Sequence, residues 1–222
     1  WSYARDGRLV GVPHRSEYPG LETAKLGLVP VALERWHGFL FVTLEPGEGQ
    51  SLGGGTVPSV AEMMAPYEDE VAPYRFEALR AIGRVTLRPR PLNWKTIADN
   101  YSDGLHIPVG HPGLTRLFGR GYRIEAGAHV DRMEGELVDA ESANPSERAY
   151  QKFLPEAEHL PPSHRRKWLY YKLFPNVAFD IYPDQVDFMQ FLPVSATETV
   201  IREISYPLPD ERREMKGERY LN

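Results

Sequence analysis

Two aspartates and two histidines lie close together in the middle of the sequence. Asp99, Asp103 and His106 are spaced at i, i+4 and i+7, which would place them on one face of a helix. His111 follows Pro108, where that helix is expected to end, so its imidazole can turn back toward His106. Two neutral imidazoles with a carboxylate nearby are a common way to hold a divalent transition metal, and Asp103 would orient His106 through a ring nitrogen. The spacing indicates a candidate metal site, and two ordinary surface or capping histidines remain the alternative.

A helix over Leu92–Leu105 would present these residues. Pro91 suits the first turn of a helix, and apolar residues from Trp94 to Leu105 recur at helical spacing. The alternating pattern predicts strands around it, and a loop with a helical turn is expected between them, over Ala143–Lys167. The predicted strands are Arg75–Arg88, a pair within Tyr122–Val138, then Trp168–Phe174, Val177–Tyr182, Gln185–Val194 and Thr197–Tyr206. With a helix expected over Glu211–Leu221, the fold class is α+β, an antiparallel sheet with long helices.

The first segment of the chain reads as a separate β-rich unit. Strands are expected over Leu26–Glu34 and Phe39–Glu45, followed by a Gly- and Ser-rich stretch over residues 47–55. We place the domain boundary there, with one domain over residues 1–50 and a second over residues 56–222. A short helix is expected over Val60–Pro66.

Composition excludes several classes of protein. The chain has 222 residues, 41% of them hydrophobic, a formal net charge of −5 and no Cys. It lacks the run of about 20 apolar residues that a membrane-spanning helix needs, and its acidic balance argues against a nucleic-acid binder. Without Cys the chain alone has no disulfide, no thiolate nucleophile and no iron–sulfur cluster. No signal peptide opens it, from which we expect the cytoplasm, and we expect a fragment because it begins at Trp1 and ends within a predicted helix.

The region around the histidines resembles a known signature. The run from Asn93 to Pro112, NWKTIADNYSDGLHIPVGHP, resembles the iron-binding signature of Rieske non-haem iron oxygenase α subunits, the aromatic-ring-hydroxylating dioxygenase family. Trp1–Val10 is similar to the sequence just after the second Cys/His ligand pair of that family's Rieske domain. Trp36–Val42 resembles the closing strands of the same domain.

The resemblance implies a role for each matched residue. His106 and His111 would ligate a mononuclear Fe(II). Asp103 would be the catalytic residue that links His106 to a cluster-ligating histidine of a neighbouring subunit, in a homotrimeric ring with or without β subunits. Asn100 would lie just behind the ligands. Apolar residues after the second histidine are predicted to line the substrate pocket, with ordinary core as the alternative: Leu114, Leu117 and Phe118.

The resemblance also implies what the chain lacks. Residues 1–50 would be the C-terminal remainder of a small all-β Rieske domain, with the ligands of its [2Fe-2S] cluster before Trp1. Residues 56–222 would be a helix-grip-like catalytic domain, truncated before its last helix, so the third carboxylate ligand is expected beyond Asn222. Asp184 and Asp187 are poor substitutes, because a turn and a strand usually leave such carboxylates solvated.

The function implied is that of a terminal oxygenase component. It would activate O2 at Fe(II), fed by a Rieske cluster, to hydroxylate or oxidatively demethylate an aromatic or other small organic substrate. NAD(P)H would drive it through a separate ferredoxin or reductase, and aromatic hydrocarbon catabolism is the expected setting. Two alternatives stay open: a zinc-dependent hydrolase using the same two histidines, and a non-enzymatic module that binds a small ligand.

Overall fold

The computed structural model describes residues 1–43, 58–153 and 157–207. The chain divides into two compact units, Trp1–Glu62 and Met63–Asn222. The expected linker over residues 47–55 and the expected helix over Glu211–Leu221 lie outside the described residues. The domain assignment therefore stays a prediction.

The first unit consists of two small hairpins and short helical turns. Strands β1 (Ser2–Tyr3) and β2 (Leu9–Gly11) pair with each other, as do β3 (Ala32–Trp36) and β4 (Phe39–Thr43). Two 3-10 turns, η1 (Arg15–Glu17) and η2 (Thr23–Lys25), lie between the hairpins. His37 and Gly38 connect β3 to β4 with φ of 44° and 87°, and positive φ at both central residues is typical of a type I′ turn. His37 is thus a hairpin turn residue.

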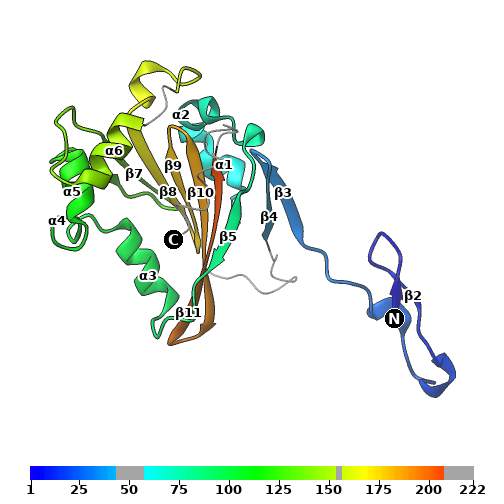
Figure 1. Cartoon of the computed structure of the whole chain (residues 1–222). Coiled ribbons are helices and arrows are strands. Elements are labelled where there is room, and N and C mark those ends of the chain that lie inside the picture. Colours follow the sequence, from blue (N-terminus) through cyan, green and yellow to red (C-terminus); the bar gives the residue numbers. More distant parts are fainter. Residues whose placement is uncertain (44–57, 154–156, 208–222) are drawn as a thin grey trace. The chain divides into compact units, whose positions relative to one another are not determined.

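A seven-stranded antiparallel sheet forms the second unit, in the order β5-β11-β10-β9-β8-β7-β6 (Figure 1). Its strands are β5 (Gly83–Thr86), β6 (Arg123–Glu125), β7 (Val130–Glu136), β8 (Lys167–Leu173), β9 (Val177–Tyr182), β10 (Gln185–Ser195) and β11 (Glu198–Pro207). The predicted pair within Tyr122–Val138 and the four predicted strands from Trp168 to Tyr206 are confirmed. The alternation of apolar and polar residues along these strands indicates a sheet whose two faces have different environments.

Helices α3 (Trp94–Ser102), α4 (Ile107–Gly110), α5 (Pro112–Phe118) and α6 (Pro145–Phe153) lie to one side of this sheet (Figure 1). The chain enters the sheet through α1 (Val60–Met64), η3 (Ala65–Tyr67), α2 (Glu68–Val71), η4 (Ala72–Tyr74) and η5 (Phe76–Ala78), and η6 (Pro162–His164) precedes β8. The helices and the antiparallel sheet confirm the α+β fold class. No helix among the described residues is long and apolar enough to cross a membrane.

Three predicted elements differ from the structure. Of the strand expected over Leu26–Glu34 only the end is formed, within β3 (Ala32–Trp36). The strand over Arg75–Arg88 is formed only at Gly83–Thr86, because Arg75 has a φ of 50° and the next residues form η5. Phe76 in η5 is buried and its ring lies 5.9 Å from that of Phe179, so packing overrides the alternation. The expected loop with a helical turn over Ala143–Lys167 contains a longer helix, α6, which Asn144 caps by accepting a 2.9 Å hydrogen bond from the Ser146 N–H.

An ion-pair network fastens α2 to the sheet face that points away from α3. Arg132 on β7 is 9% exposed and binds both carboxylate oxygens of Glu70, at 2.6 and 2.7 Å. The hydroxyl of Tyr171 donates to the same carboxylate.

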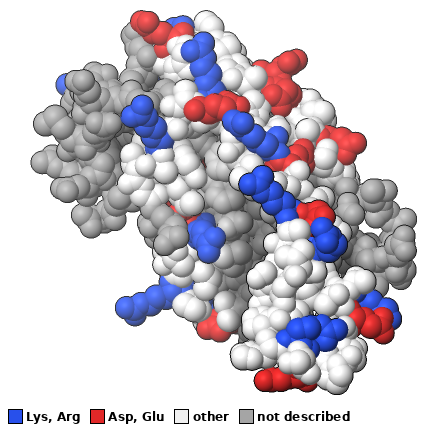
Figure 2. Space-filling view, turned by 90° about the vertical axis from the view of Figure 1, so that its right-hand side faces the viewer, with Lys and Arg blue, Asp and Glu red and all other residues white. Residues whose placement is uncertain are grey.

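On the surface shown in Figure 2, Lys and Arg are interspersed with Asp and Glu, and neither sign forms a continuous patch over the described residues.

Close packing of α5 on the sheet leads to a prediction. The ring of Phe118 covers Gly135 so closely that a Cβ there would lie 2.6 Å from it, and Phe118 is only 2% exposed. We expect Gly135→Ala to lower the free energy of unfolding by about 1–3 kcal/mol through overpacking. Denaturant unfolding measures this, with Gly20→Ala as the control, since nothing lies within 4 Å of a Cβ at Gly20. Equal stability of the two variants would contradict the contact.

Candidate metal centre

Helix α3 begins at a capped residue and buries one face against the sheet. The side chain of Asn93 accepts a 2.9 Å hydrogen bond from the Lys95 N–H and donates one of 2.7 Å to the Ala196 carbonyl, which satisfies an otherwise unpaired helix amide. Ala98 is buried against Ala178 and Phe191. Half-buried apolar side chains surround this contact: Trp94, Ile97, Tyr101, Met189 and Ile201.

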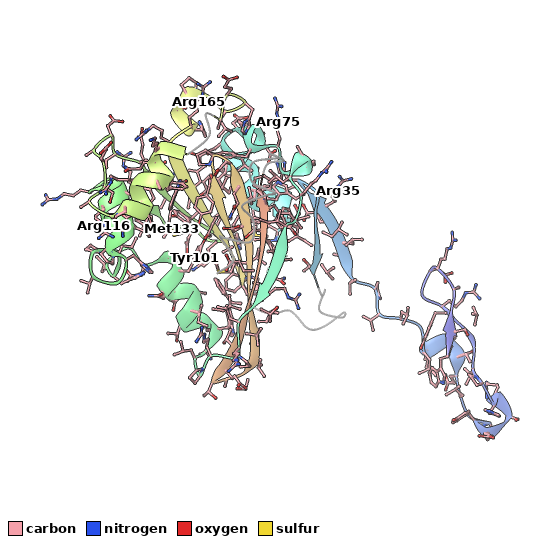
Figure 3. The ribbon with its side chains drawn as sticks, viewed as in Figure 1. Arg35, Arg75, Tyr101, Arg116, Met133 and Arg165 are labelled. Atoms are coloured by element: carbon pink, nitrogen blue, oxygen red, sulfur yellow. The ribbon has the colours of Figure 1, made fainter. Side chains whose placement is uncertain are left out.

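Polar contacts then fix the C-terminal end of α3. Ser102 donates to Asp131 on β7 at 2.8 Å, and Lys172 on β8 binds both that carboxylate, at 2.8 Å, and the Ala98 carbonyl, at 3.3 Å. Tyr101 reaches from α3 to the sheet, where its hydroxyl donates to Asp180 (Figure 3). These contacts fix the position of the end of α3, and therefore the point from which the loop with the histidines begins.

Asp103 and His106 come together although they do not share a helix. α3 ends at Ser102, and Asp103 is its C-cap with extended backbone, φ −84° and ψ 123°. One carboxylate oxygen of Asp103 accepts the Leu105 N–H at 2.9 Å, and the other lies 3.3 Å from Nδ1 of His106. The backbone N–H of Leu105, followed by the His106 side chain, lowers the pKa of Asp103 below its usual value. The expected helical face is thus wrong in geometry, and Asp99 lies exposed on α3.

His106 and His111 face each other across the single turn of α4. Their ring centroids are 5.0 Å apart, with 70° between the ring planes. His111 is both the C-cap of α4 and the N-cap of α5. Because Asp103 engages Nδ1 of His106, the Nε2 of that ring is left to coordinate a metal. The pair fits two positions of a mononuclear site.

A third ligand is not found in the described part of the chain. No group of three His, Cys, Asp or Glu side chains there is arranged to hold a metal ion. Asp184 is buried between β9 and β10, and Asp187 on β10 accepts hydrogen bonds of 2.8 and 3.1 Å from Gln185. Neither carboxylate joins the histidines, but the predicted reason is wrong, because both side chains are buried and not solvated. The expectation of a ligand beyond Asn222 stays open.

The other predicted site residues occupy different environments. Asn100 is exposed on α3, and its carbonyl accepts the Asp103 N–H at 3.3 Å. Leu117 and Phe118 are buried with Leu137, and Leu114 packs against this cluster. The Phe118 ring lies 5.2 Å from that of Trp168 on β8, so this cluster adjoins the sheet face below α3. The assignment of these residues to a substrate pocket remains a prediction.

The sequence alone did not identify Asp180 as a candidate functional residue. Asp180 on β9 shares the face of the sheet that α3 covers with Ala178 and Tyr182, since side chains alternate along a strand. Burial raises the pKa of Asp180 to about 7, despite hydrogen bonds from Tyr101 and Tyr182. The alternation of β9 was visible in the sequence, but nothing there showed which face was which.

The site consists of one pair of histidines that follows a helix packed on a seven-stranded antiparallel sheet. The family described as "Ring hydroxylating alpha subunit (catalytic domain)" matches residues 76–222. The chain belongs to this family, which confirms the resemblance to Rieske oxygenase α subunits.

Individual relatives agree with this assignment. The chain is 32% identical over 119 residues to the carnitine monooxygenase oxygenase subunit of Escherichia coli K12, a match covering 52% of this chain and 29% of that protein. It is 27% identical over 112 residues to the chloroplastic choline monooxygenase of Beta vulgaris, covering 50% and 24%.

Solved structures extend the likeness of fold to the whole chain. A quaternary ammonium Rieske monooxygenase matches with a TM-score of 0.68 at 17% identity, over 100% of this chain and 56% of that one. A naphthalene 1,2-dioxygenase matches with 0.59 at 20%, over 98% and 53%. The chain thus spans about half the length of these solved relatives.

The buried carboxylate of Asp180 leads to a prediction about pH. An acid whose pKa is about 7 when folded and 3.8 ordinarily binds its proton more tightly in the folded state, so the protein loses stability as pH rises from about 4 to 7. Asp187 and Glu203, whose pKa values burial also raises, act in the same direction. We expect Asp180→Asn to reduce this loss, as measured by urea unfolding at pH 5 and 7.5.

Asp99→Asn is the matched control, because Asp99 is exposed on α3. An Asp180→Asn protein whose stability falls with pH as steeply as the unmodified protein would contradict the assignment.

Proposed function

We propose that this chain is the catalytic part of a terminal oxygenase component, with a mononuclear Fe(II) held by His106 and His111. The observation that carries the proposal is the pairing of these rings, 5.0 Å apart, with Asp103 against Nδ1 of His106. An Fe(II) ion held there would supply the chemistry of O2 activation beside a bound substrate, with electrons delivered from elsewhere. The chain's own residues hold the ligand rings: α4 sets their separation and Asp103 orients one imidazole.

The same proposal includes the parts expected on either side of the chain. A [2Fe-2S] Rieske cluster would be held by residues before Trp1, in a domain that ends within residues 1–50, and a carboxylate beyond Asn222 would complete the iron site. A ferredoxin or reductase would supply electrons. Residues 56–222 would then form the catalytic domain, and the cytoplasm remains the proposed location.

A quaternary ammonium compound is the substrate class we favour over an aromatic hydrocarbon. The relatives with significant sequence similarity are named for carnitine and choline, and one for glycine betaine. The likeness to naphthalene 1,2-dioxygenase is one of fold alone. Membership of the oxygenase family also favours this function over a zinc hydrolase or a binding module.

Substitution of the paired histidines tests the iron site. In the intact polypeptide we expect about three irons per chain, two in the cluster and one mononuclear. His106→Ala or His111→Ala should lower the count to about two, with the visible spectrum of the cluster unchanged. His129→Ala is the control, since His129 lies exposed on the loop before β7. Stoichiometric zinc at the histidines would instead support the hydrolase.

Exposed apolar residues beside the histidines support a homotrimer. Leu105 and Val109 flank His106 and are 90% and 88% exposed in the isolated chain. A subunit interface at this loop would cover them, and it would bring Asp103 to a neighbouring subunit.

A charge placed in this loop should break the trimer. We expect Val109→Asp to shift the sedimentation coefficient from that of a trimer to that of a monomer, because a carboxylate would have to be buried at the interface. Val194→Asp is the matched control, since Val194 is 58% exposed at the far end of β10. A trimer that persists in Val109→Asp would place the interface elsewhere.

A further inference from the structure

The sheet face beneath α3 has a carboxylate at its centre and tyrosines around it. Asp180 on β9 lies directly opposite Tyr170 on β8 and Asp187 on β10. The hydroxyl of Tyr101 donates to one oxygen of Asp180, and that of Tyr182 lies 3.5 Å from the other. Asp180, Tyr101 and Tyr182 each keep part of their surface accessible. This face is therefore neither a closed apolar core nor open surface.

The rings on this face stand at right angles to one another. Tyr182 meets Trp168 edge-on, with centroids 4.7 Å apart and 86° between planes, and meets Tyr170 at 6.4 Å and 85°. Perpendicular rings place the negatively polarised face of one ring beside the edge of another. The result is an aromatic corner next to the Asp180 carboxylate.

This corner is connected to both histidine-bearing segments. Tyr101 lies in the last turn of α3, two residues before Asp103. Phe118 ends α5, which begins after His111, and its ring contacts Trp168 at 5.2 Å. A group bound against Asp180 would thus lie on the sheet face that α3 and α5 contact, and these helices flank the histidines.

The negative charge on this face has no positive partner among the described residues. Asp180, Asp187 and Glu203 form no ion pair with a described Lys or Arg, and Lys172, on the same face, is bound by Asp131 at 2.8 Å. The cost of the unpaired charge is visible in the pKa of Asp180, which burial raises to about 7. A bound cation would remove part of that cost.

The walls select the kind of cation. No group of three His, Cys, Asp or Glu among the described residues could hold a metal ion here, whereas the faces of aromatic rings attract an organic cation whose charge is spread over methyl groups. Such a cation donates no hydrogen bond, so it needs a nearby negative charge rather than free acceptor positions. We propose that Asp180, with the rings of Tyr170 and Tyr182, binds the methylated ammonium group of the substrate, an assignment that rests on the oxygenase function proposed above.

Binding of a charged probe and its neutral isostere tests this proposal. Choline and 3,3-dimethylbutan-1-ol have the same shape and differ by one charge, and calorimetry of the intact protein measures both without turnover. We expect the unmodified protein to bind choline at least about tenfold more tightly. Asp180→Asn should abolish that preference, while Asp99→Asn, which removes an exposed charge from α3, should keep it.

A second variant guards against a failure of Asp180→Asn to fold. Tyr182→Leu keeps the carboxylate and removes one ring, and it should weaken choline binding by about tenfold while changing the affinity for the neutral alcohol less. Equal affinity of the unmodified protein for both probes, or a choline preference that survives in Asp180→Asn, would overturn the proposal.

The outcome separates this site from the oxygenase function. Loss of choline preference in Asp180→Asn with iron retained supports the site. A choline preference in a protein whose His106 and His111 bind no iron would refute the oxygenase and leave the cation site standing. Full iron content with equal affinity for choline and the neutral alcohol would support the oxygenase function and refute the cation site.

Discussion

The docking of α3 on the sheet is the constraint on which the candidate site depends. Ala98 packs on Ala178 and Phe191, and beyond this apolar contact Ser102 and Tyr101 bind carboxylates from two different strands. These contacts determine where the helix ends. Because Asp103, His106 and His111 follow within a short loop and the single turn of α4, an error in the placement of Ser102 would be carried directly into the separation of the two imidazoles.

Two of the carboxylates that bind α3 are compensated very differently. Burial alone would raise the pKa of Asp131, but hydrogen bonds from Lys172 and Ser102 lower it below the usual value. Asp180 receives only tyrosine hydroxyls, and burial raises its pKa to about 7. If α3 merely had to be held in place, the arrangement at Asp131 would serve at both points. A buried carboxylate without a nearby cation lowers the stability of the fold. A ligand that carries a positive charge would reduce this loss, which supports a role for Asp180 in binding.

The sequence predicted the part of the fold whose signal is local. Four strands from Trp168 to Tyr206 alternate regularly, and Pro183 and Asp184 mark the turn between β9 and β10. The histidine pair was found by its spacing and by resemblance. The end of α3 at Ser102 was missed because it depends on tertiary contacts, which the pattern of one helix does not contain. The importance of Asp180 was missed for a related reason: alternation shows that Asp180 and Tyr182 share a face, and only the pairing of five strands shows that α3 covers it.

The two faces of the sheet differ in composition. On the face away from α3, Leu169, Tyr171, Phe179 and Ile181 are completely buried, so substitutions there act on the core. The intervening positions, 168, 170, 180 and 182, carry the aromatic corner and its carboxylate. If the proposed cation site is correct, changes at these positions would alter what the protein binds and leave the opposite layer of the core in place. Because the histidines come from the loop after α3 and not from the sheet, the substrate class can change with the strands while the metal loop keeps its geometry. A sheet beneath a proposed metal site that lies on a separate loop would thus allow the substrate to change while the chemistry stays the same.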